Sequence, residues 1–332
     1  MIGVFLIWVA FRGISFRDLG SILSKANYLW LLLSITISIG GFAIRARRWM
    51  LLMEPLGQMP SFRNTYHSVL TGYLGNMLFP RLGEVSRCAA LSKKENMAFD
   101  KLIGTVILER TIDMVSVLII LGFMLIYGSA SSGAFLTDNI FKPMNEKLMT
   151  WFGFSGAIYI LAITLFIIFL YLLFRYRKKL SKHPVINKVI TFMSGILDGL
   201  KTIAGLKRKW EFIILTILLW VSYLLMAWVP VFCLESTSGL DLGAGIFILV
   251  IGSLGMAVPV QSGIGAFHWI VSRGINFVYG IPLDQGLAYA TLEHESQMIL
   301  IAILGSVSLF ILFGRKGSRI LTETSPSHDS KE

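Results

Sequence analysis

Long apolar runs alternate with short polar segments along most of the chain. The longest runs cover residues 28–44, 102–127, 154–174, 212–234 and 287–313. Windows of roughly 17 to 25 nearly uncharged residues match a hydrocarbon core of about 30 Å at a helical rise of about 1.5 Å per residue. The pattern therefore predicts an all-α, polytopic integral membrane protein with about six to eight membrane helices.

The composition favours the same class of protein. Of the 332 residues, 55% are hydrophobic and only 15% are charged, and the mean hydropathy is +0.71. Soluble domains carry about 25% charged residues. The net charge of +11 comes from Lys and Arg residues beside the apolar runs, which indicates the positive-inside rule and no nucleic-acid partner. Cys88 and Cys233 lie far apart without a CxxC or Cys/His pattern, so neither a disulfide framework nor a zinc site is expected from them.

The two ends of the chain are expected to differ from the rest. Residues 1–11 are apolar, but as a helix they would be only about 16 Å long, too short to cross a bilayer. They lack a basic n-region and a cleavage site, so a shortened first helix is expected instead of a signal peptide. Residues 1–314 are expected to form one transmembrane domain, and the polar residues 315–332 a disordered cytoplasmic tail.

The basic residues orient the predicted spans. Segment 175–210 is rich in Lys and Arg and is predicted to form a cytoplasmic amphipathic helix. This helix would lie either on an anionic lipid surface or against the protein itself. Segments 128–152 and 235–242 carry few or no basic residues and are expected outside. Two further groups are interpreted as cytoplasmic loops, namely Arg45, Arg47, Arg48 and Arg63 after run 28–44, and Arg81, Arg87, Lys93, Lys94 and Lys101 before run 102–127.

These assignments predict a re-entrant hairpin. If Arg63 and Arg81 lie on the same side, segment 65–80 enters the membrane and leaves it on that side. Gly72, Gly75 and Pro80 interrupt this segment, and segment 83–91 would form the second limb. Such a limb is polar enough to need protein or water around it rather than lipid.

The later half of the chain repeats this pattern from the opposite side. Segment 246–258 meets the sequence PVQSGIG at 259–265 and turns into segment 266–280. Each broken hairpin precedes a long run with charges near its start: Glu109, Arg110 and Asp113 in the first half, and Glu293, His294 and Glu295 in the second. Together they predict an inverted repeat with a site where the broken elements meet.

Proline and glycine end a helix with free backbone groups, which can hold an anion at membrane depth. Arginines add charge-assisted donors suited to phosphate, and intramembrane charges are costly enough to indicate function. The alternative is a salt-bridged cluster that only locks helices together. No catalytic residue, metal ligand or cofactor is predicted. The candidate substrate-binding residues are Asn76, Pro80, Arg81, Gly83, Glu84, Arg87, Glu109, Arg110, Asp113, Pro259, Gly263, Gly265, His268 and His294.

The histidines allow two interpretations. His268 could relay a proton or donate to a headgroup, or it could be a satisfied packing residue. His294 stands between two glutamates, but Met298 occupies the place of a second histidine in a His-Glu-x-x-His motif. A zincin is therefore not supported.

Four motifs occur in the order seen in the lysylphosphatidylglycerol synthase transmembrane region family, and the chain resembles this family over nearly its whole length. The motifs are RARRW at 45–49, NMLFPRLGEVSR at 76–87, ERTID at 109–113 and PVQSGIGAFHW at 259–269. The resemblance implies a protein that moves a polar or charged lipid between leaflets. The 18 residues after position 314 are too few for the family's lysine-transferring domain, so synthase activity is not expected. Relatives often carry Glu in place of Ser262 and His268, which leaves their substrate preference unassigned here.

The resulting hypothesis is a multi-pass protein of the cytoplasmic membrane that moves an anionic or zwitterionic lipid. The alternatives are a membrane-embedded lipid-modifying transferase and a non-transporting partner of a cell-envelope lipid synthase. The expected partners are the lipid substrate and an anionic lipid surface, and a homo-oligomer is left open. The absence of a phosphate-binding loop for nucleotides indicates a gradient or downhill flow as the driving force.

Overall fold

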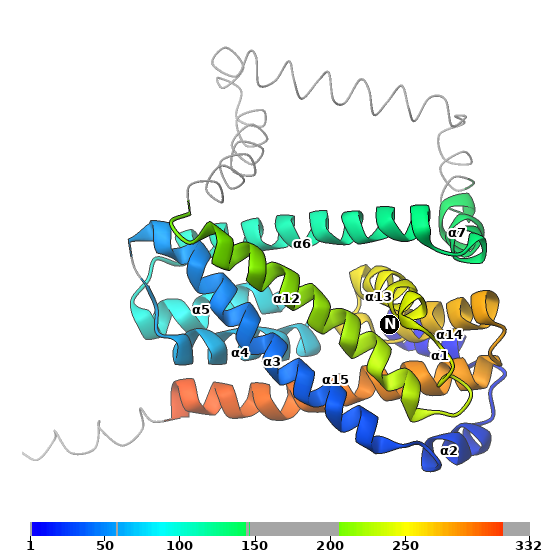
Figure 1. Cartoon of the computed structure of the whole chain (residues 1–332). Helices are drawn as coiled ribbons and strands as arrows, with labels where there is room; N and C mark the ends of the chain where they lie inside the picture. Colours follow the sequence, from blue (N-terminus) through cyan, green and yellow to red (C-terminus); the bar gives the residue numbers. More distant parts are fainter. Residues whose placement is uncertain (1, 58, 144–145, 147–205, 315–332) are drawn as a thin grey trace, which may run out of the picture.

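The computed structural model describes residues 2–57, 59–143, 146 and 206–314, and all regular secondary structure in these ranges is helical (Figure 1). The prediction of an all-α fold is confirmed. The run 154–174, most of the basic segment 175–210 and the tail 315–332 lie outside the described residues. The total of six to eight membrane helices includes that run, so it stays a prediction.

Two short helices open the chain. Helix α1 (Ile2–Phe11) has 10 residues and packs against α14 (Ala266–Tyr279). The expected short first helix is thus present. Helix α2 (Phe16–Ser24) follows, and the hydroxyl of Ser15 caps it by accepting a hydrogen bond from the backbone N–H of Asp18.

The first half of the bundle contains a long helix, a hairpin and a second long helix. These are α3 (Tyr28–Met53), α4 (Phe62–Leu78), α5 (Leu82–Glu95) and α6 (Phe99–Tyr127). The base of the hairpin is closed by Glu95, whose Oε1 atom accepts from the backbone N–H of Ser61 at 3.0 Å and from Nδ2 of Asn64 at 2.7 Å. The predicted hairpin of segments 65–80 and 83–91 is therefore present as α4 and α5.

Glycines allow the two limbs of this hairpin to touch. A Cβ atom on Gly83 would collide with the backbone oxygen of Gly72 and with the side chain of Asn76. A Cβ atom on Gly72 would lie 2.9 Å from the Cβ atom of Arg87. Only glycine permits this backbone approach, so the α4–α5 hairpin is a closely packed unit.

The second half repeats this order. It comprises α12 (Lys209–Trp228), α13 (Leu242–Ala257), α14 and α15 (Leu283–Phe313). Pro230 lies in a 3-10 turn (Val229–Cys233) at the end of α12, where its missing N–H prevents the α-helix from continuing. The predicted second hairpin forms from α13 and α14, which are joined through a 3-10 turn at Gln261–Gly263. In the segment 128–152, expected as an external loop, the described residues form α7 (Ala130–Leu136), which packs on α14, and a π-turn (Thr137–Phe141), which packs on α7.

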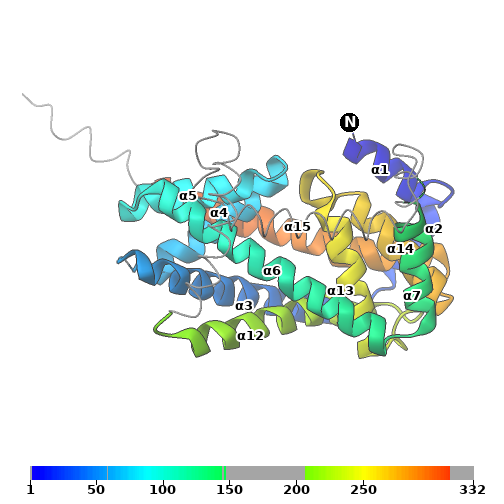
Figure 2. The same cartoon turned by 90° about the horizontal axis from the view of Figure 1, so that it is seen from above.

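The two hairpins enter the bundle from opposite ends (Figure 1). At the end that holds the base of α4–α5, Arg208 pairs with Glu54 at 3.5 Å. At the other end, the backbone N–H of Asn27 donates to the carbonyl of Cys233 at 2.8 Å. The break between α13 and α14 contacts α4, so the inner ends of the two hairpins meet (Figure 2). This is the arrangement predicted for an inverted repeat.

Helices α3 and α12 run antiparallel and pack against each other. Arg47 near the end of α3 pairs with Glu211 near the start of α12 at 2.7 Å. Ser34 near the start of α3 donates to the carbonyl of Met226 near the end of α12 at 3.4 Å. Each helix also packs on the first limb of the hairpin that follows it, α3 on α4 and α12 on α13. The packing of one half is therefore repeated in the other.

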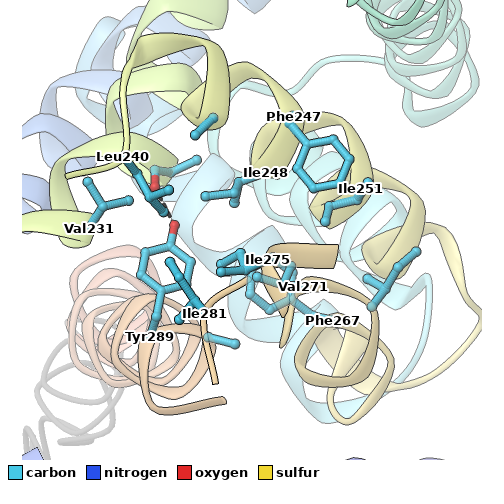
Figure 3. Close-up of a cluster of buried hydrophobic side chains, with 14 of the residues drawn as sticks. Val231, Leu240, Phe247, Ile248, Ile251, Phe267, Val271, Ile275, Ile281 and Tyr289 are labelled. Carbon is cyan, nitrogen blue, oxygen red and sulfur yellow. Dashed lines mark hydrogen bonds between the residues drawn. The ribbon is translucent and has the colours of Figure 1, made fainter. Parts of the chain in front are cut away.

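The largest apolar core lies between α12, α13, α14 and α15 (Figure 3). Phe247 and Ile251 of α13 face Val271 of α14 there, and all three are buried. Tyr289 of α15 is fully buried and its hydroxyl donates to the carbonyl of Ala227. The core fixes the second hairpin against α15, since buried aromatic and branched side chains contribute most of the packing energy.

Three described helices are long and apolar enough to cross a membrane by length and composition: Tyr28–Leu56, Lys209–Cys233 and Leu283–Phe313. Large apolar side chains such as Ile119 and Phe123 of α6 and Phe310 of α15 are exposed on the outside of the bundle. Exposed apolar surface of this kind is suited to lipid and unusual in a soluble protein. The chain is a polytopic membrane protein.

One interpretation of the sequence is wrong. Arg45, Arg47 and Arg48 were expected in a cytoplasmic loop, but they lie inside α3, which continues to Met53. Arg45 and Arg48 are buried. The helix continues because carboxylates on α6 neutralise these two guanidinium groups, so no polar loop is needed to solvate them.

Candidate functional site

Ionisable side chains form two separate groups in the described part of the chain, and each group contains some of the predicted site residues. The first, the arginine cluster, consists of Arg45, Arg48, Arg87, Glu109 and Asp113 from α3, α5 and α6. The second, the histidine group, consists of His268, His294 and Glu295 from α14 and α15. Within the described ranges, no hydrogen bond or ion pair joins the two groups.

Helical spacing brings the charges of the arginine cluster together. Arg45 and Arg48 are three positions apart on α3, and Glu109 and Asp113 are four positions apart on α6. Residues at these spacings lie on one face of a helix. Since α3 packs on α6, the two basic residues face the two acidic ones.

Glu109 is the centre of the arginine cluster. Its side chain is fully buried and is paired with three arginines. Its Oε1 atom lies 2.8 Å from Nε of Arg45 and 3.2 Å from Nη2 of Arg48. Its Oε2 atom lies 2.9 Å from Nη2 of Arg87. One carboxylate therefore connects α3, α5 and α6.

Asp113 and two tyrosines complete the surroundings of Arg45. The Oδ2 atom of Asp113 lies 2.8 Å from Nη2 of Arg45, and its Oδ1 atom accepts from Nη2 of Arg48 at 2.6 Å. Nη1 of Arg45 donates to the hydroxyls of Tyr73 at 3.0 Å and Tyr223 at 2.7 Å. These contacts extend the cluster to α4 and α12, so it joins both halves of the bundle.

The arginine cluster holds more positive than negative charge. Three buried guanidinium groups face the carboxylates of Glu109 and Asp113, which leaves one positive charge uncompensated within the cluster. Nε and Nη1 of Arg48 and Nε of Arg87 are buried without a hydrogen-bond partner among the described residues. Arg87 also lies over the ring of Trp49, 4.7 Å from its centroid, which partly offsets its lost hydration. The cluster is thus electrostatically suited to an additional anion.

Two further arginines lie at the edge of the cluster, where they are accessible. Nη2 of Arg110 lies 2.9 Å from Oε1 of Glu84, and the two side chains are 42% and 27% exposed. Arg81 is exposed at the tip of the first hairpin and adopts a left-handed backbone conformation with φ of 62°. No ion pair or side-chain hydrogen bond of Arg81 occurs in the described part of the chain. The edge therefore offers cationic groups that an incoming anion can reach.

The tip of the first hairpin is closed by backbone and amide contacts. Oδ1 of Asn76 accepts from the backbone N–H of Gly83 at 2.7 Å, and Pro80 lies exposed in the turn. Between this tip and the arginine cluster is a pocket with room for about 10 Å³, the space of about one water molecule. Its lining includes Arg45, Arg87 and Arg110. In this conformation the pocket is too small for a lipid headgroup.

The histidine group lies at the inner end of the second hairpin. His268 lies in the first turn of α14, just after the segment that contains Pro259, Gly263 and Gly265. Both histidines are buried, and their ring centroids are 4.9 Å apart. Gly263 and Gly265 adopt φ values of 70° and 80°, which glycine tolerates without strain. The glycines predicted for this site therefore shape the turn.

Sequence reasoning missed five contributors to these groups: Arg45, Arg48, Tyr73, Tyr223 and Glu295, of which Glu295 was noted only as a charge beside His294. Arg45 and Arg48 were assigned to a loop, although their spacing matches that of Glu109 and Asp113. Nothing in the sequence indicated Tyr73 and Tyr223, because a single tyrosine in an apolar run is usually a packing or interfacial residue.

Residues 1–305 match the family model described as the lysylphosphatidylglycerol synthase TM region. A UPF0104 membrane protein of Methanocaldococcus jannaschii is 22% identical over 313 residues, which cover 88% of this chain and 87% of that protein. No solved structure matches the chain significantly. With a match across almost all of the membrane-spanning region, the chain belongs to the lysylphosphatidylglycerol synthase transmembrane region family.

Proposed function

We propose that this protein is a flippase-like transporter that moves an anionic or zwitterionic lipid between the leaflets of the cytoplasmic membrane. The lipid's phosphate would bind at the edge of the arginine cluster. The observation that carries the proposal is the uncompensated positive charge of Arg45, Arg48 and Arg87 beside Glu109 and Asp113. Burying an unpaired charge is costly, so an anion that binds beside it is stabilised.

The accessible arginines provide the first contacts in this proposal. Arg81 and Arg110 are exposed at the hairpin tip and at its neighbour α6. A guanidinium group can hold phosphate through two parallel hydrogen bonds. A phosphate bound to Arg110 would compete with Glu84, whose pair with Arg110 is half-exposed and therefore weak.

Movement of the first hairpin is required for a headgroup to enter. The pocket between the hairpin tip and the cluster has room for about 10 Å³, whereas ligand sites commonly measure about 300 Å³ or more. Because Gly72 and Gly83 hold α4 and α5 in contact, we expect the hairpin to move as one unit. Two hairpins that enter from opposite ends would then open the path to one side at a time, as in other transporters built from inverted repeats.

Reconstitution into liposomes tests the proposed function. Vesicles would contain fluorescent analogues of phosphatidylglycerol, phosphatidylethanolamine or a polyprenyl phosphate, and reduction of the accessible label would report leaflet exchange. We expect the protein to move at least one of these lipids without changing its mass. A change in lipid mass would indicate a transferase instead. Neither movement nor a mass change for any anionic or zwitterionic lipid would favour a partner of another lipid enzyme.

A further inference from the structure

The histidine group brings three metal-ligating atoms together at the inner end of the second hairpin. Nε2 of His268 lies 3.5 Å from Oε1 of Glu295, and Nδ1 of His294 lies 3.1 Å from the same oxygen. One ligating atom from each of the three residues lies within 4.8 Å of the other two. His268 belongs to α14, and the other two residues belong to α15.

These distances fit a tetrahedral metal ion. Zinc binds nitrogen and oxygen ligands at about 2.0 to 2.2 Å, so two ligands of a tetrahedral ion are about 3.3 to 3.6 Å apart. The two separations measured from Oε1 of Glu295, 3.5 Å and 3.1 Å, lie at or close to this range.

The hydrogen bond of His294 to the backbone determines which of its ring nitrogens faces the carboxylate of Glu295. Its Nε2 atom lies 2.8 Å from the carbonyl oxygen of Ser262, which can only accept, so Nε2 carries a proton. Nδ1 of a neutral ring then presents a lone pair to the carboxylate of Glu295. Two acceptors in contact require a cation between them, either a proton or a metal ion. Donation of the outer N–H to a backbone carbonyl is the usual support for a histidine that binds a metal.

The backbone at Ser262 is strained in a way that supplies this support. Ser262 has φ of 46° and ψ of 28°, a left-handed conformation that is unfavourable for a non-glycine residue. The conformation directs its carbonyl to His294. Nδ1 of the buried His268 has no hydrogen-bond partner in the described ranges. A neutral His268 with its proton on that nitrogen presents the lone pair of Nε2 to the centre of the group.

The geometry points to a divalent metal site of the zinc class, held by His268, His294 and Glu295. Two imidazoles and one carboxylate form the ligand set of many zinc sites that leave one position open. The Glu295 side chain is 41% exposed, so the open position can accept water or another oxygen ligand. This inference does not depend on the proposed lipid transport. Sequence spacing gives no motif for it, because the ligands come from α14 and α15, which meet only through tertiary packing.

Metal analysis of the intact protein tests this inference. The full-length chain would be purified in detergent with a tag that contains no histidine, equilibrated with ZnCl₂ and passed through a desalting column. We expect about one zinc per chain by mass spectrometry. Replacement by Co²⁺ should give the intense visible absorption of a four-coordinate ion. A zinc content below about 0.1 per chain, with no such absorption, would overturn the inference and leave a shared proton between His294 and Glu295.

Matched variants identify the ligands. The changes His268→Gln, His294→Gln and Glu295→Gln should each lower the zinc content at least several-fold. The controls are His67→Gln, whose ring contacts Ser308 instead, and Glu293→Gln, which lies next to the group. Both controls should keep the wild-type zinc content. Zinc that is lost equally from the controls would be bound elsewhere, and the assignment would be wrong.

A stability readout guards against misfolded variants. Addition of zinc should raise the melting temperature of the wild type and of His67→Gln, since a ligand that binds only the folded state stabilises it. The same addition should not shift the melting temperature of Glu295→Gln. Equal shifts in all three proteins would contradict the assignment even if a ligand variant folds poorly.

Discussion

The inner ends of the two hairpins occupy corresponding places in the two halves of the bundle, yet their chemistry differs. Beside the first hairpin, five charged groups are packed together, and Glu109 alone contacts three arginines. Beside the second hairpin, the imidazole rings of His268 and His294, which can be neutral, face the carboxylate of Glu295. The first site has a surplus of positive charge and is short of an anion, whereas the second is short of a cation. The two halves thus share an arrangement of helices, whereas the net charges of their two sites have opposite sign.

Burial explains how each site tolerates its charges. Arg48 and Glu109 have fully buried side chains, so neither can be solvated by water and each depends on the other. Glu295 remains 41% exposed and can be solvated without its partners. We therefore expect the arginine cluster to be required for folding to a much greater degree than the histidine group.

The largest expected effect is on folding, through Glu109. The change Glu109→Gln removes the charge that compensates Arg45, Arg48 and Arg87, and breaking a buried ion pair costs about 3 to 5 kcal/mol. Folded yield in detergent, measured by size-exclusion chromatography, should fall sharply. Glu84→Gln is the matched control, because its half-exposed pair with Arg110 contributes about 1 kcal/mol or less. Glu295→Gln should resemble the control. Similar yields for Glu109→Gln and Glu295→Gln would contradict the contrast between the two sites.

The second effect concerns the close contact inside the first hairpin. Gly83→Ala places a Cβ atom against the backbone of Gly72 and the side chain of Asn76, and forcing the limbs apart should cost about 1 to 3 kcal/mol. Gly104→Ala on α6 is the control, because nothing lies within 4 Å of its added Cβ atom. Alanine should be neutral or stabilising there, since glycine in a helix costs about 0.5 to 1 kcal/mol. Thermal unfolding measures both, and equal melting temperatures would show that the hairpin limbs are not held by this contact.

The smallest expected effect is a pH dependence at the base of the first hairpin, outside the membrane-spanning segments. Burial raises the pKa of Glu95, but hydrogen bonds from Asn64 and Ser61 outweigh it and the pKa is lowered. The folded state therefore gains stability above the unfolded pKa of about 4.3, and this gain is lost as the pH falls through the lower folded pKa. Glu95→Gln should lower the melting temperature at pH 7 by a small amount, and its difference from the wild type should vanish as the pH falls below the folded pKa of Glu95. A difference that persists unchanged at low pH would exclude this cause.

Much of the fold could be predicted from the sequence. The breaks at Pro80 and in PVQSGIG follow directly from the local preferences of proline and glycine, and both hairpins are present where they were expected. The path of α3 through Arg45 and Arg48 could not be predicted, because it depends on acidic residues about 60 positions away on another helix. A prediction from local hydropathy ends the membrane span at such arginines, whereas in the folded protein α3 continues to Met53.

The sites could be predicted only in part for the same reason. Glu109, Asp113 and Arg87 were identified because charges in apolar segments are rare. Arg81 was grouped with them by its closeness in sequence, but it lies exposed at the hairpin tip with no carboxylate partner in the described part of the chain. His268 and Glu295 meet only after α14 packs on α15, and no sequence spacing reports that contact.

The central claim is that arginines beside the first hairpin bind the lipid's phosphate, and Arg→Lys variants test it most directly. Lysine keeps the positive charge but loses the planar group that can hold phosphate through two bonds. Lipid movement in liposomes and folded yield would be measured for Arg81→Lys, Arg110→Lys and the corresponding Ala variants. The proposal predicts that both Lys variants fold normally and lose most of the transport. Normal transport by both Lys variants, with loss confined to poorly folded Ala variants, would show that these arginines serve only as a scaffold.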